Sequence, residues 1–188
     1  MVQKRDLSAE KIIQTATDLI KADGADAATF GNIAKALNCR TQALYFYFKN
    51  HNDLLLGVAT NFFATLNHEV QTACFDLNGR EALIKMATTI RNYGRQNLDL
   101  SLAVMRTSGL PDHLSAFNET RHLSEMMQQY IGDFISDPVQ QLSISRGVRA
   151  MIIGEVVSES VGWFTNPAID RDDSFVDNLM RLFDESQK

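Results

Sequence analysis

The sequence is poor in the residues that break helices and make tight turns. Its 188 residues include only three prolines and ten glycines, whereas β-sandwiches and barrels with many turns normally need more. Two cysteines, Cys39 and Cys74, are too few for a disulfide framework, which favours the reducing cytosol. The most apolar run, residues 148–157, is far shorter than a membrane span and contains Arg149 and Glu155. We therefore expect an all-α, cytoplasmic protein that does not enter a membrane.

Charge is distributed unevenly along the chain. The net charge of −5 argues against binding to nucleic acid, because a polyanion repels an acidic protein. Residues 1–56 nevertheless carry a net charge of +1, while the remaining 132 residues carry −6. No apolar stretch follows Lys4 and Arg5, so we do not expect them to begin a signal peptide. The N-terminal part is the part whose charge can tolerate a phosphate backbone.

Apolar spacing and capping residues predict short helices at the start of the chain. Ser8 is expected to cap a first helix, and Gly24 to end it. Thr29 is expected to cap a second helix, residues 38–40 form a tight turn, and a third helix covers residues 41–47. Two short helices joined by such a turn are typical of a helix-turn-helix. An αα-corner in an ordinary bundle has the same spacing, so spacing alone leaves both interpretations open.

The third helix carries side chains that suit DNA on the face turned away from the core. Leu44 and Phe48 lie four residues apart and are expected to face inward. The outward side chains can then donate hydrogen bonds to base edges or phosphates; they are Arg40, Thr41, Gln42, Tyr45 and Lys49. This surface chemistry favours the DNA-binding interpretation.

A long helix and several further helices are expected after residue 50. Asn50 and Asp53 resemble a capping pair at the start of a helix that runs to about residue 74. Such a helix is longer than a small three-helix head and must continue into a second body. Further helices are expected at residues 80–97, 99–107, 113–136, 139–165 and 172–185.

Residues 8–56 also carry a more specific pattern. It reads Ile12-Ile13-x-x-Ala16-x-x-Leu19-Ile20, Gly24, Thr29-x-x-x-Ile33-Ala34 and Ala43-Leu44-Tyr45-x-Tyr47-Phe48-x-Asn50-x-x-Asp53-Leu54-Leu55. This pattern resembles the N-terminal DNA-binding domain of the TetR family of bacterial one-component repressors. The rest of the chain agrees with that family in length and in helical character.

The resemblance implies a domain organisation and a function. Residues 1–52 would form the helix-turn-helix DNA-binding domain, and residues 53–188 a helical domain for ligand binding and dimerisation. The protein would be a homodimeric transcriptional repressor that binds a palindromic DNA operator and is released from it by a small-molecule inducer. The long helix after residue 50 would transmit the change.

The resemblance also assigns roles to residues of the DNA-binding domain. Thr29, Tyr45 and Lys49 would hold phosphates, while Arg40, Thr41 and Gln42 would meet base edges. Tyr47 and His51 complete the expected DNA-binding set.

Three positions depart from the family pattern, which usually has His at position 47, Lys at position 51 and Gly at position 38. Asn38 tolerates the left-handed conformation nearly as well as glycine, so the turn survives. His51 supplies the charge of the usual lysine only when it is protonated. We therefore expect lower DNA affinity and a shallower salt dependence than in a relative with lysine there.

Two C-terminal helices are apolar on more than one side, which suggests contact with a second copy of the chain. The expected dimer-interface residues are Val148, Ile152, Val156, Phe175, Leu179 and Leu182. A monomer that covers these faces internally is the alternative.

The middle helices are expected to surround a ligand cavity. Candidate lining residues combine thioethers, aromatic rings and a few polar groups; they are Tyr93, Met105, His113, Phe117, Met126, Met127, Tyr130 and Trp163. Ordinary core packing explains the same residues equally simply. Four arginines could meet an anionic ligand, but solvation or salt bridges are the simpler interpretation; they are Arg91, Arg95, Arg106 and Arg121.

The sequence gives little support to a metal site or an enzyme. Glu119-x-x-His122 matches only half of a di-iron carboxylate site. The acidic run at residues 170–173 lacks the glycine of a calcium loop, because Phe175 stands in its place. We expect no cofactor and no catalytic residues. The remaining alternative is a helical small-molecule-binding or enzymatic protein in which the helix-turn-helix is only structural.

Overall fold

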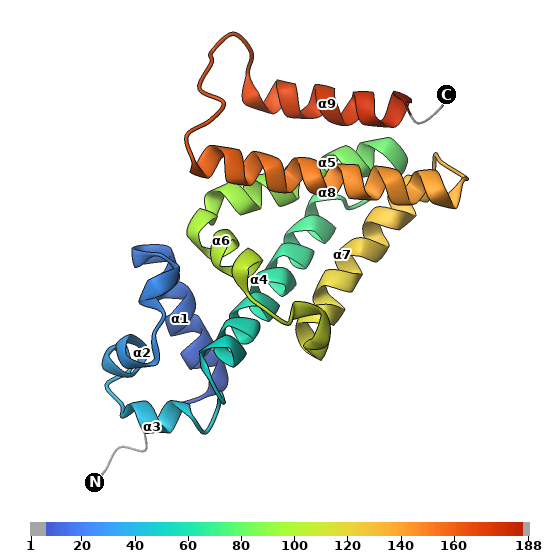
Figure 1. Cartoon of the computed structure of the whole chain (residues 1–188). Helices are drawn as coiled ribbons and strands as arrows, with labels where there is room; N and C mark the ends of the chain where they lie inside the picture. Colours follow the sequence, from blue (N-terminus) through green and yellow to red (C-terminus); the bar gives the residue numbers. More distant parts are fainter. Residues whose placement is uncertain (1–6, 186–188) are drawn as a thin grey trace. The chain divides into compact units, whose positions relative to one another are not determined.

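The computed structural model describes residues 7–185, and within that range it consists of helices and connecting loops without a β-strand (Figure 1). The α-helices in chain order are α1 (Ala9–Asp23), α2 (Phe30–Ala36), α3 (Thr41–Leu44), α4 (His51–Ala73), α5 (Gly79–Gln96), α6 (Leu98–Arg106), α7 (Leu114–Gly132), α8 (Pro138–Ser160) and α9 (Arg171–Glu185). Single 3-10 turns lie at Ala25–Ala27 and Leu110–Asp112. The predicted all-α fold is confirmed.

The chain divides into two compact units. The first unit contains residues up to Ala64 together with Asn97–Asn118, and the second contains Thr65–Gln96 and the chain from Glu119 onward. Helix α4 therefore contributes its first part to one unit and its last part to the other. The expected division into residues 1–52 and 53–188 is a division by role, and it stays a prediction.

Capping side chains begin the first helices where the sequence predicted. The Ser8 hydroxyl accepts a hydrogen bond from the Lys11 backbone N–H at 3.3 Å, and the Thr29 hydroxyl accepts one from Asn32 at 3.1 Å. Gly24 ends α1 with φ +83°, a conformation that side chains with a Cβ rarely adopt. These local interactions fix the ends of α1 and the start of α2.

The start of α4 is held by a reciprocal pair. The Asn50 side chain accepts a hydrogen bond from the Asp53 backbone N–H, and the Asp53 carboxylate accepts one from the Lys49 N–H, both at 2.9 Å. The predicted capping pair is confirmed. It fixes the turn that leads from α3 into α4.

The core of the first unit is formed by the predicted apolar faces. Ile12, Ile20 and Ile33 are fully buried, and so are Leu44 and Leu54. Helix α6 also contacts α1 in this unit. Burial of these aliphatic side chains stabilises the orientation of α2 and α3 on α1.

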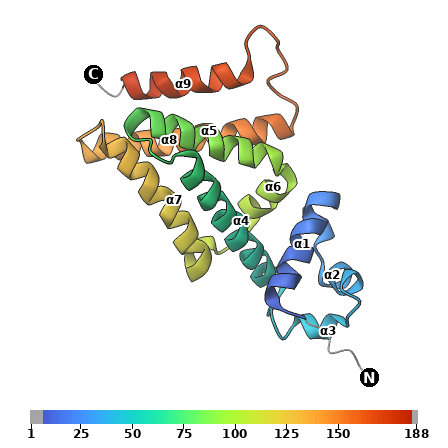
Figure 2. The same cartoon turned by 180° about the vertical axis from the view of Figure 1, so that it is seen from behind.

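The second unit is built around α8, which contacts both α5 and α9; Figures 1 and 2 show the three helices side by side. Helices α8 and α9 approach closely at Gly147, where an added Cβ would lie 2.8 Å from Leu182 Cδ2. Phe175 and Phe183 of α9 are buried in this packing. The seam between α8 and α9 is therefore part of the core of a single chain.

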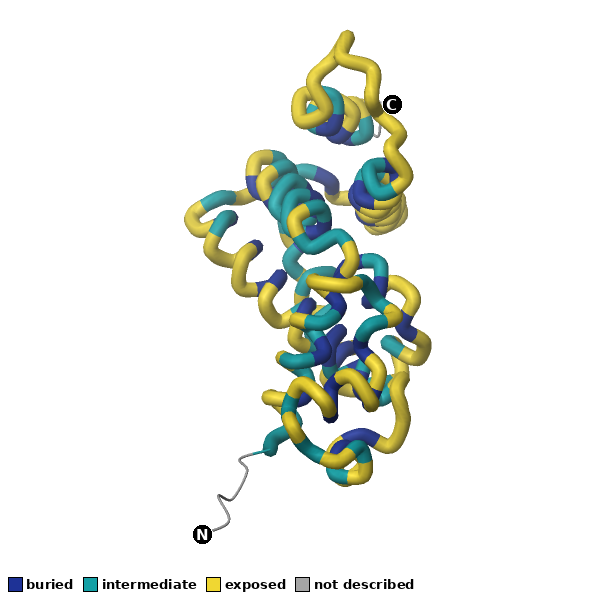
Figure 3. Tube along the Cα trace, turned by 90° about the vertical axis from the view of Figure 1, so that its left-hand side faces the viewer, coloured by how far each residue is buried: buried dark blue, intermediate teal, exposed yellow. Residues whose placement is uncertain are grey.

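Three helices are shorter than predicted. Helix α3 ends at Leu44 instead of residue 47, α7 ends at Gly132 instead of residue 136, and α8 ends at Ser160 instead of residue 165. Gly162 (φ +73°) and Phe164 (φ +56°) adopt left-handed conformations that cannot continue a helix. Residues 161–170 are exposed throughout, and Figure 3 shows them as an unbroken exposed stretch.

No helix within residues 7–185 is both long enough and apolar enough to cross a membrane.

Candidate functional site

The turn between α2 and α3 has the geometry that the sequence predicted. Asn38 adopts φ +49°, in the left-handed region where asparagine is one of the better tolerated residues. The chain then becomes extended at Arg40 (φ −85°, ψ 143°) and enters α3 at Thr41. The turn lets α2 and α3 pack against each other and leaves one face of α3 open.

The open face carries polar side chains above a buried base. Leu44 is fully buried and Phe48 is 7% exposed, which confirms that both face the core. Arg40, Gln42 and Lys49 are exposed, and Thr41 is half-buried.

Tyr45 is 57% exposed, with its ring edge-on to Phe30 at 4.9 Å between ring centroids. This contact holds the tyrosine ring against α2. We call Arg40, Thr41, Gln42, Tyr45 and Lys49 the α3 face. Thr29, at the start of α2, is exposed as well.

Tyr47 and His51 make hydrogen bonds within the first unit. The Tyr47 hydroxyl donates to the Leu7 carbonyl at 2.5 Å, which ties the loop after α3 to the residue before Ser8. His51 Nε2 lies 3.0 Å from the Ala28 carbonyl, so this nitrogen carries the proton and donates. Both residues thus have structural partners beside the α3 face, and their DNA contacts stay predictions.

The candidate ligand-binding residues are divided between the two units. Met105, His113 and Phe117 belong to the first unit. The second unit contains Tyr93, Met126, Met127, Tyr130 and Trp163.

These candidates differ in burial. Met127 is buried and accepts a hydrogen bond from the Ser145 hydroxyl at 3.6 Å, whereas Trp163 is 66% exposed in the segment after α8. Burial raises the pKa of both Tyr93 and Tyr130, which keeps their phenol groups protonated. The role of all eight residues in ligand binding stays a prediction.

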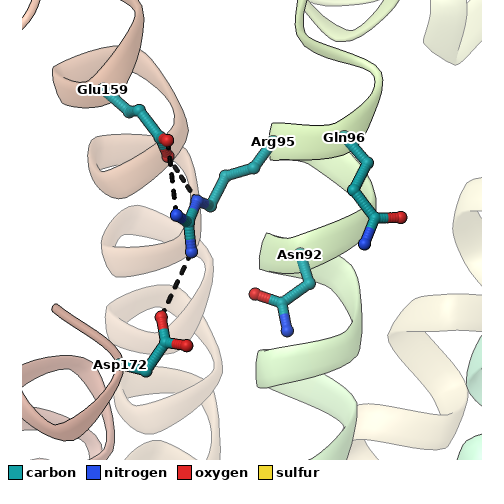
Figure 4. A pocket seen from close by; sticks show the side chains of 5 residues that line it. All are labelled: Asn92, Arg95, Gln96, Glu159 and Asp172. Atoms are coloured by element: carbon teal, nitrogen blue, oxygen red, sulfur yellow. Dashed lines mark hydrogen bonds and ion pairs between the residues drawn. The ribbon is translucent and has the colours of Figure 1, made fainter.

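Two pockets lie in the second unit, and both are lined by residues other than these candidates. One, of about 390 Å³, is lined by Asn92, Arg95, Gln96, Glu159 and Asp172 (Figure 4). The other, of about 210 Å³, is lined by Glu155, Phe164, Asn166, Ile169, Arg171, Ser174 and Asn178. Of the residues that line the larger pocket, only Arg95 was a candidate from the sequence, as one of four arginines that could meet an anionic ligand.

An arginine–carboxylate cluster joins the two pockets. It consists of Arg91, Arg95, Arg171, Glu155, Glu159 and Asp172, which come from α5, α8 and α9. Arg95 makes a two-pronged contact with Glu159, which raises the pKa of the guanidinium further and keeps it charged. Salt bridges therefore account for Arg91 and Arg95, and Arg121 pairs with Glu125 on the surface of α7.

Arg91 is the buried centre of this cluster, with its side chain only 1% exposed. Its Nη2 donates to Asp172 Oδ1 at 2.7 Å, its Nε lies 3.3 Å from Glu155 Oε2, and the guanidinium carbon lies 4.7 Å from the centre of the Phe175 ring. The hydrogen bond from Arg91 is the main reason that the pKa of Asp172 is lowered. Asp172 thus stays ionised and ties the first turn of α9 to α5.

The expected dimer-interface residues are largely buried inside one chain. Val148, Ile152 and Val156 of α8 are at most 6% exposed, and Phe175 and Leu179 of α9 are fully buried, while Leu182 is half-buried. The apolar faces that the sequence predicted are thus used where α8 packs against α5 and α9. Other apolar side chains of these helices are exposed, namely Val139, Leu142, Ile153, Val157 and Met180.

No cluster of three or more metal-ligating side chains occurs in the described part of the chain. Glu119 and His122 instead bond to neighbours on α4. The Asn67 amide donates to the Glu119 carboxylate at 2.7 Å, and His122 Nε2 lies 2.6 Å from Gln71 Nε2. Asp170 caps α9 through the Asp172 and Asp173 backbone N–H groups, as expected of a capping turn.

Comparisons with known proteins agree with the geometry of the first unit. Residues 12–58 match the family model of bacterial regulatory proteins of the tetR family. Comparison with curated proteins gives no match.

Solved structures show a similar fold over nearly the whole chain. A possible TetR-family transcriptional regulator from Streptomyces coelicolor A3(2) is 18% identical, with a TM-score of 0.75, and the match covers 96% of this chain and 98% of that one. A TetR variant from Acinetobacter baumannii AYE in complex with minocycline is 19% identical (TM-score 0.68, 97% of both chains). BioQ with its double-stranded DNA operator is 19% identical (TM-score 0.63, 96% of this chain and 98% of that one).

The family pattern thus lies on the unit that carries the α3 face, and the helical fold of solved family members extends over the rest of the chain. Residues 12–58 are therefore similar to the bacterial regulatory proteins of the tetR family.

Proposed function

We propose that this protein is a ligand-responsive transcriptional repressor that acts in the cytoplasm as a homodimer on a palindromic operator. The observation that carries the proposal is the α3 face, where five side chains that can bind DNA stand beside the capped start of α2. Arg40, Thr41 and Gln42 would meet base edges in the major groove, and Thr29, Tyr45 and Lys49 would hold phosphates. The similarity to BioQ, which was solved with its DNA operator, supports this assignment.

Homodimerisation would occur through the exposed sides of α8 and α9. Ala150, Ile153 and Val157 are exposed and recur every three or four residues, so they share one face of α8, and the exposed Val161 follows directly after its end. Such a face suits a second copy of the same chain. A dimer would place two α3 faces about 34–36 Å apart, the spacing of successive major grooves.

A small-molecule inducer would act by shifting the population of conformations. A ligand that prefers a dimer with wrongly spaced α3 faces weakens operator binding by a coupling of about 1–3 kcal/mol. Helix α4 is the route we propose, because it is one continuous helix that starts after α3 and belongs to both compact units. The similarity to a TetR variant solved with minocycline supports a ligand-responsive role.

The proposal is tested by selecting DNA from a random pool with the purified protein and sequencing the retained fragments. We expect an inverted repeat whose half-site centres lie about 10 base pairs, or a multiple of that, apart. Gln42→Ala should weaken discrimination at one base pair of each half-site by about 5- to 150-fold, because one base-edge contact is lost. Tyr45→Phe keeps the ring against Phe30 and removes only the hydroxyl group that would hold a phosphate.

Gln128→Ala is the matched control, because Gln128 is an exposed glutamine on α7. It should leave both affinity and specificity unchanged. Failure of the wild-type protein to enrich any sequence would refute the proposal. Equal specificity of Gln42→Ala and wild type would refute the assigned role of the α3 face.

A further inference from the structure

Asp172 differs from the other carboxylates of the arginine–carboxylate cluster in its exposure. Its side chain is 65% exposed, compared with 18% for Glu155 and 31% for Glu159. A single oxygen, Oδ1, nevertheless accepts from Arg91 Nη2 at 2.7 Å and from Arg95 Nη1 at 3.1 Å. Two guanidinium groups on α5 therefore converge on one carboxylate that reaches them from the solvent side.

A cavity of about 390 Å³ opens beside this contact. Figure 4 shows Arg95 reaching from α5 to Glu159 and Asp172, with Asn92 and Gln96 on α5 beside it. Within residues 7–185 the side-chain amides of Asn92 and Gln96 make no hydrogen bond, so they remain able to donate and accept. The cavity thus offers a guanidinium group and two uncommitted amides next to a replaceable carboxylate.

The charge of the cluster also makes Asp172 the replaceable member. Three arginines face three carboxylates, so the cluster is neutral while Asp172 is in place. Loss of Asp172 leaves one excess positive charge close to Arg91, which is fully buried and whose Nε already lacks a well-aligned hydrogen-bond acceptor. A buried, uncompensated cation is costly, so the arginines require an anion at this place.

We propose that the cavity beside Arg95 binds a small molecule with a carboxylate group, and that Asp172 occupies the carboxylate position when the ligand is absent. The ligand carboxylate replaces Asp172 on Arg95 and Arg91, which keeps the cluster neutral. Asn92 and Gln96 hold polar groups in the remainder of the ligand. None of the eight predicted ligand-binding residues lines this cavity.

Ligand binding at this place would free the start of α9. Asp172 lies in the first turn of α9, and its bonds to Arg91 and Arg95 join that turn to α5. Helix α9 also packs against α8, which carries the proposed dimer face. The identification of this carboxylate ligand as the effector rests on the proposed function. Binding of a carboxylate in the cavity does not depend on DNA binding.

The test is rescue of an Asp172→Ala variant of the full chain by acetate. Thermal unfolding is followed by circular dichroism in sodium acetate and in sodium chloride of equal ionic strength at pH 7. We expect the variant to unfold at a lower temperature than wild type in chloride. At acetate concentrations tenfold above the dissociation constant its Tm should rise by about 3–6 °C. Wild type should gain less, because acetate must compete with Asp172.

Asp173→Ala is the matched control, because it removes a neighbouring acidic residue from the same first turn of α9. It should show no acetate-specific gain. Adding Arg95→Gln to Asp172→Ala should abolish the gain, since the main accessible donor is lost. Should Asp172→Ala fail to fold, Asp172→Asn removes the charge with little change in shape and is expected to show the same rescue.

Equal stabilisation of Asp172→Ala and Asp173→Ala by acetate would overturn the proposal. So would equal stabilisation by chloride, or a gain that survives Arg95→Gln. These outcomes are independent of DNA selection, so a failure of this site leaves the proposed repressor function standing, and the reverse also holds.

Discussion

The buried guanidinium of Arg91 permits a quantitative prediction about stability. The substitution Arg91→Met removes a cation whose side chain is 1% exposed and whose partners are Glu155 and Asp172. Asp172 is mostly exposed and regains water, whereas Glu155, at 18% exposure, stays largely desolvated without its partner. Removing one member of a buried ion pair costs about 3–5 kcal/mol. Because one of the two partners is hydrated again, we expect the lower end, about 3 kcal/mol.

The matched control is the same substitution in an exposed ion pair. Arg121 lies 2.7 Å from Glu125 one helical turn away, and both side chains are more than half exposed. Arg121→Met should therefore cost only about 0.5 kcal/mol or less. Urea unfolding followed by far-UV circular dichroism measures both variants under the same conditions.

A double variant separates lost pairing from lost packing. Adding Glu155→Gln to Arg91→Met removes the carboxylate charge that lost its partner. The double variant should therefore lose less free energy of unfolding than the two single variants lose together, with a difference of at least about 1 kcal/mol. If Arg91→Met costs no more than Arg121→Met, the burial argument is wrong. If the two substitutions are additive, Glu155 is not the reason for the loss.

Three further predictions follow from individual contacts. His51→Lys should raise operator affinity and steepen the salt dependence by about 0.9 in log–log slope through one added phosphate contact; the exposed His68→Lys on α4 is the control, and an unchanged slope contradicts the reasoning. Asn50→Ala should cost about 1 kcal/mol in urea unfolding, because the cap on Asp53 is lost; no loss would mean that the cap is replaced. The lowered pKa of Asp172 means that its contribution to stability is present above its ordinary value of 3.8 and is lost as pH falls through the lower folded-state pKa. Wild type should therefore lose stability more steeply than Asp172→Asn as pH falls below about 4, and parallel acid titrations of the two proteins would argue against this.

Local sequence patterns predicted the first unit well because its geometry is set by neighbouring residues. A hydroxyl at Ser8 or Thr29 reaches the backbone three residues further on, and Asn38 accepts the left-handed conformation of the turn. Leu44 and Phe48 face inward because they lie one helical turn apart. Each of these interactions spans fewer than five residues, so it can be inferred before the fold is known.

Tertiary partners could not be inferred in the same way. Periodicity showed that Val148 and Phe175 belong to apolar faces, but a face has the same pattern whether it meets another helix or another chain. Both side chains are buried by helices of their own chain, and their role in a dimer interface stays a prediction. The contact between Arg91 and Asp172 joins residues 81 positions apart, and no local spacing predicts such a pair. The ligand-binding candidates stay predictions for the same reason.

The exposed position of Trp163 has a practical consequence for measurement. It is the single tryptophan of the sequence, and two thirds of its side chain is accessible in the segment between α8 and α9. The indole emission therefore reports on one known place without any attached label. A spectrum that moves to shorter wavelength as protein concentration rises would locate subunit contact at this segment, and a shift on adding an effector at constant concentration would record a local change there.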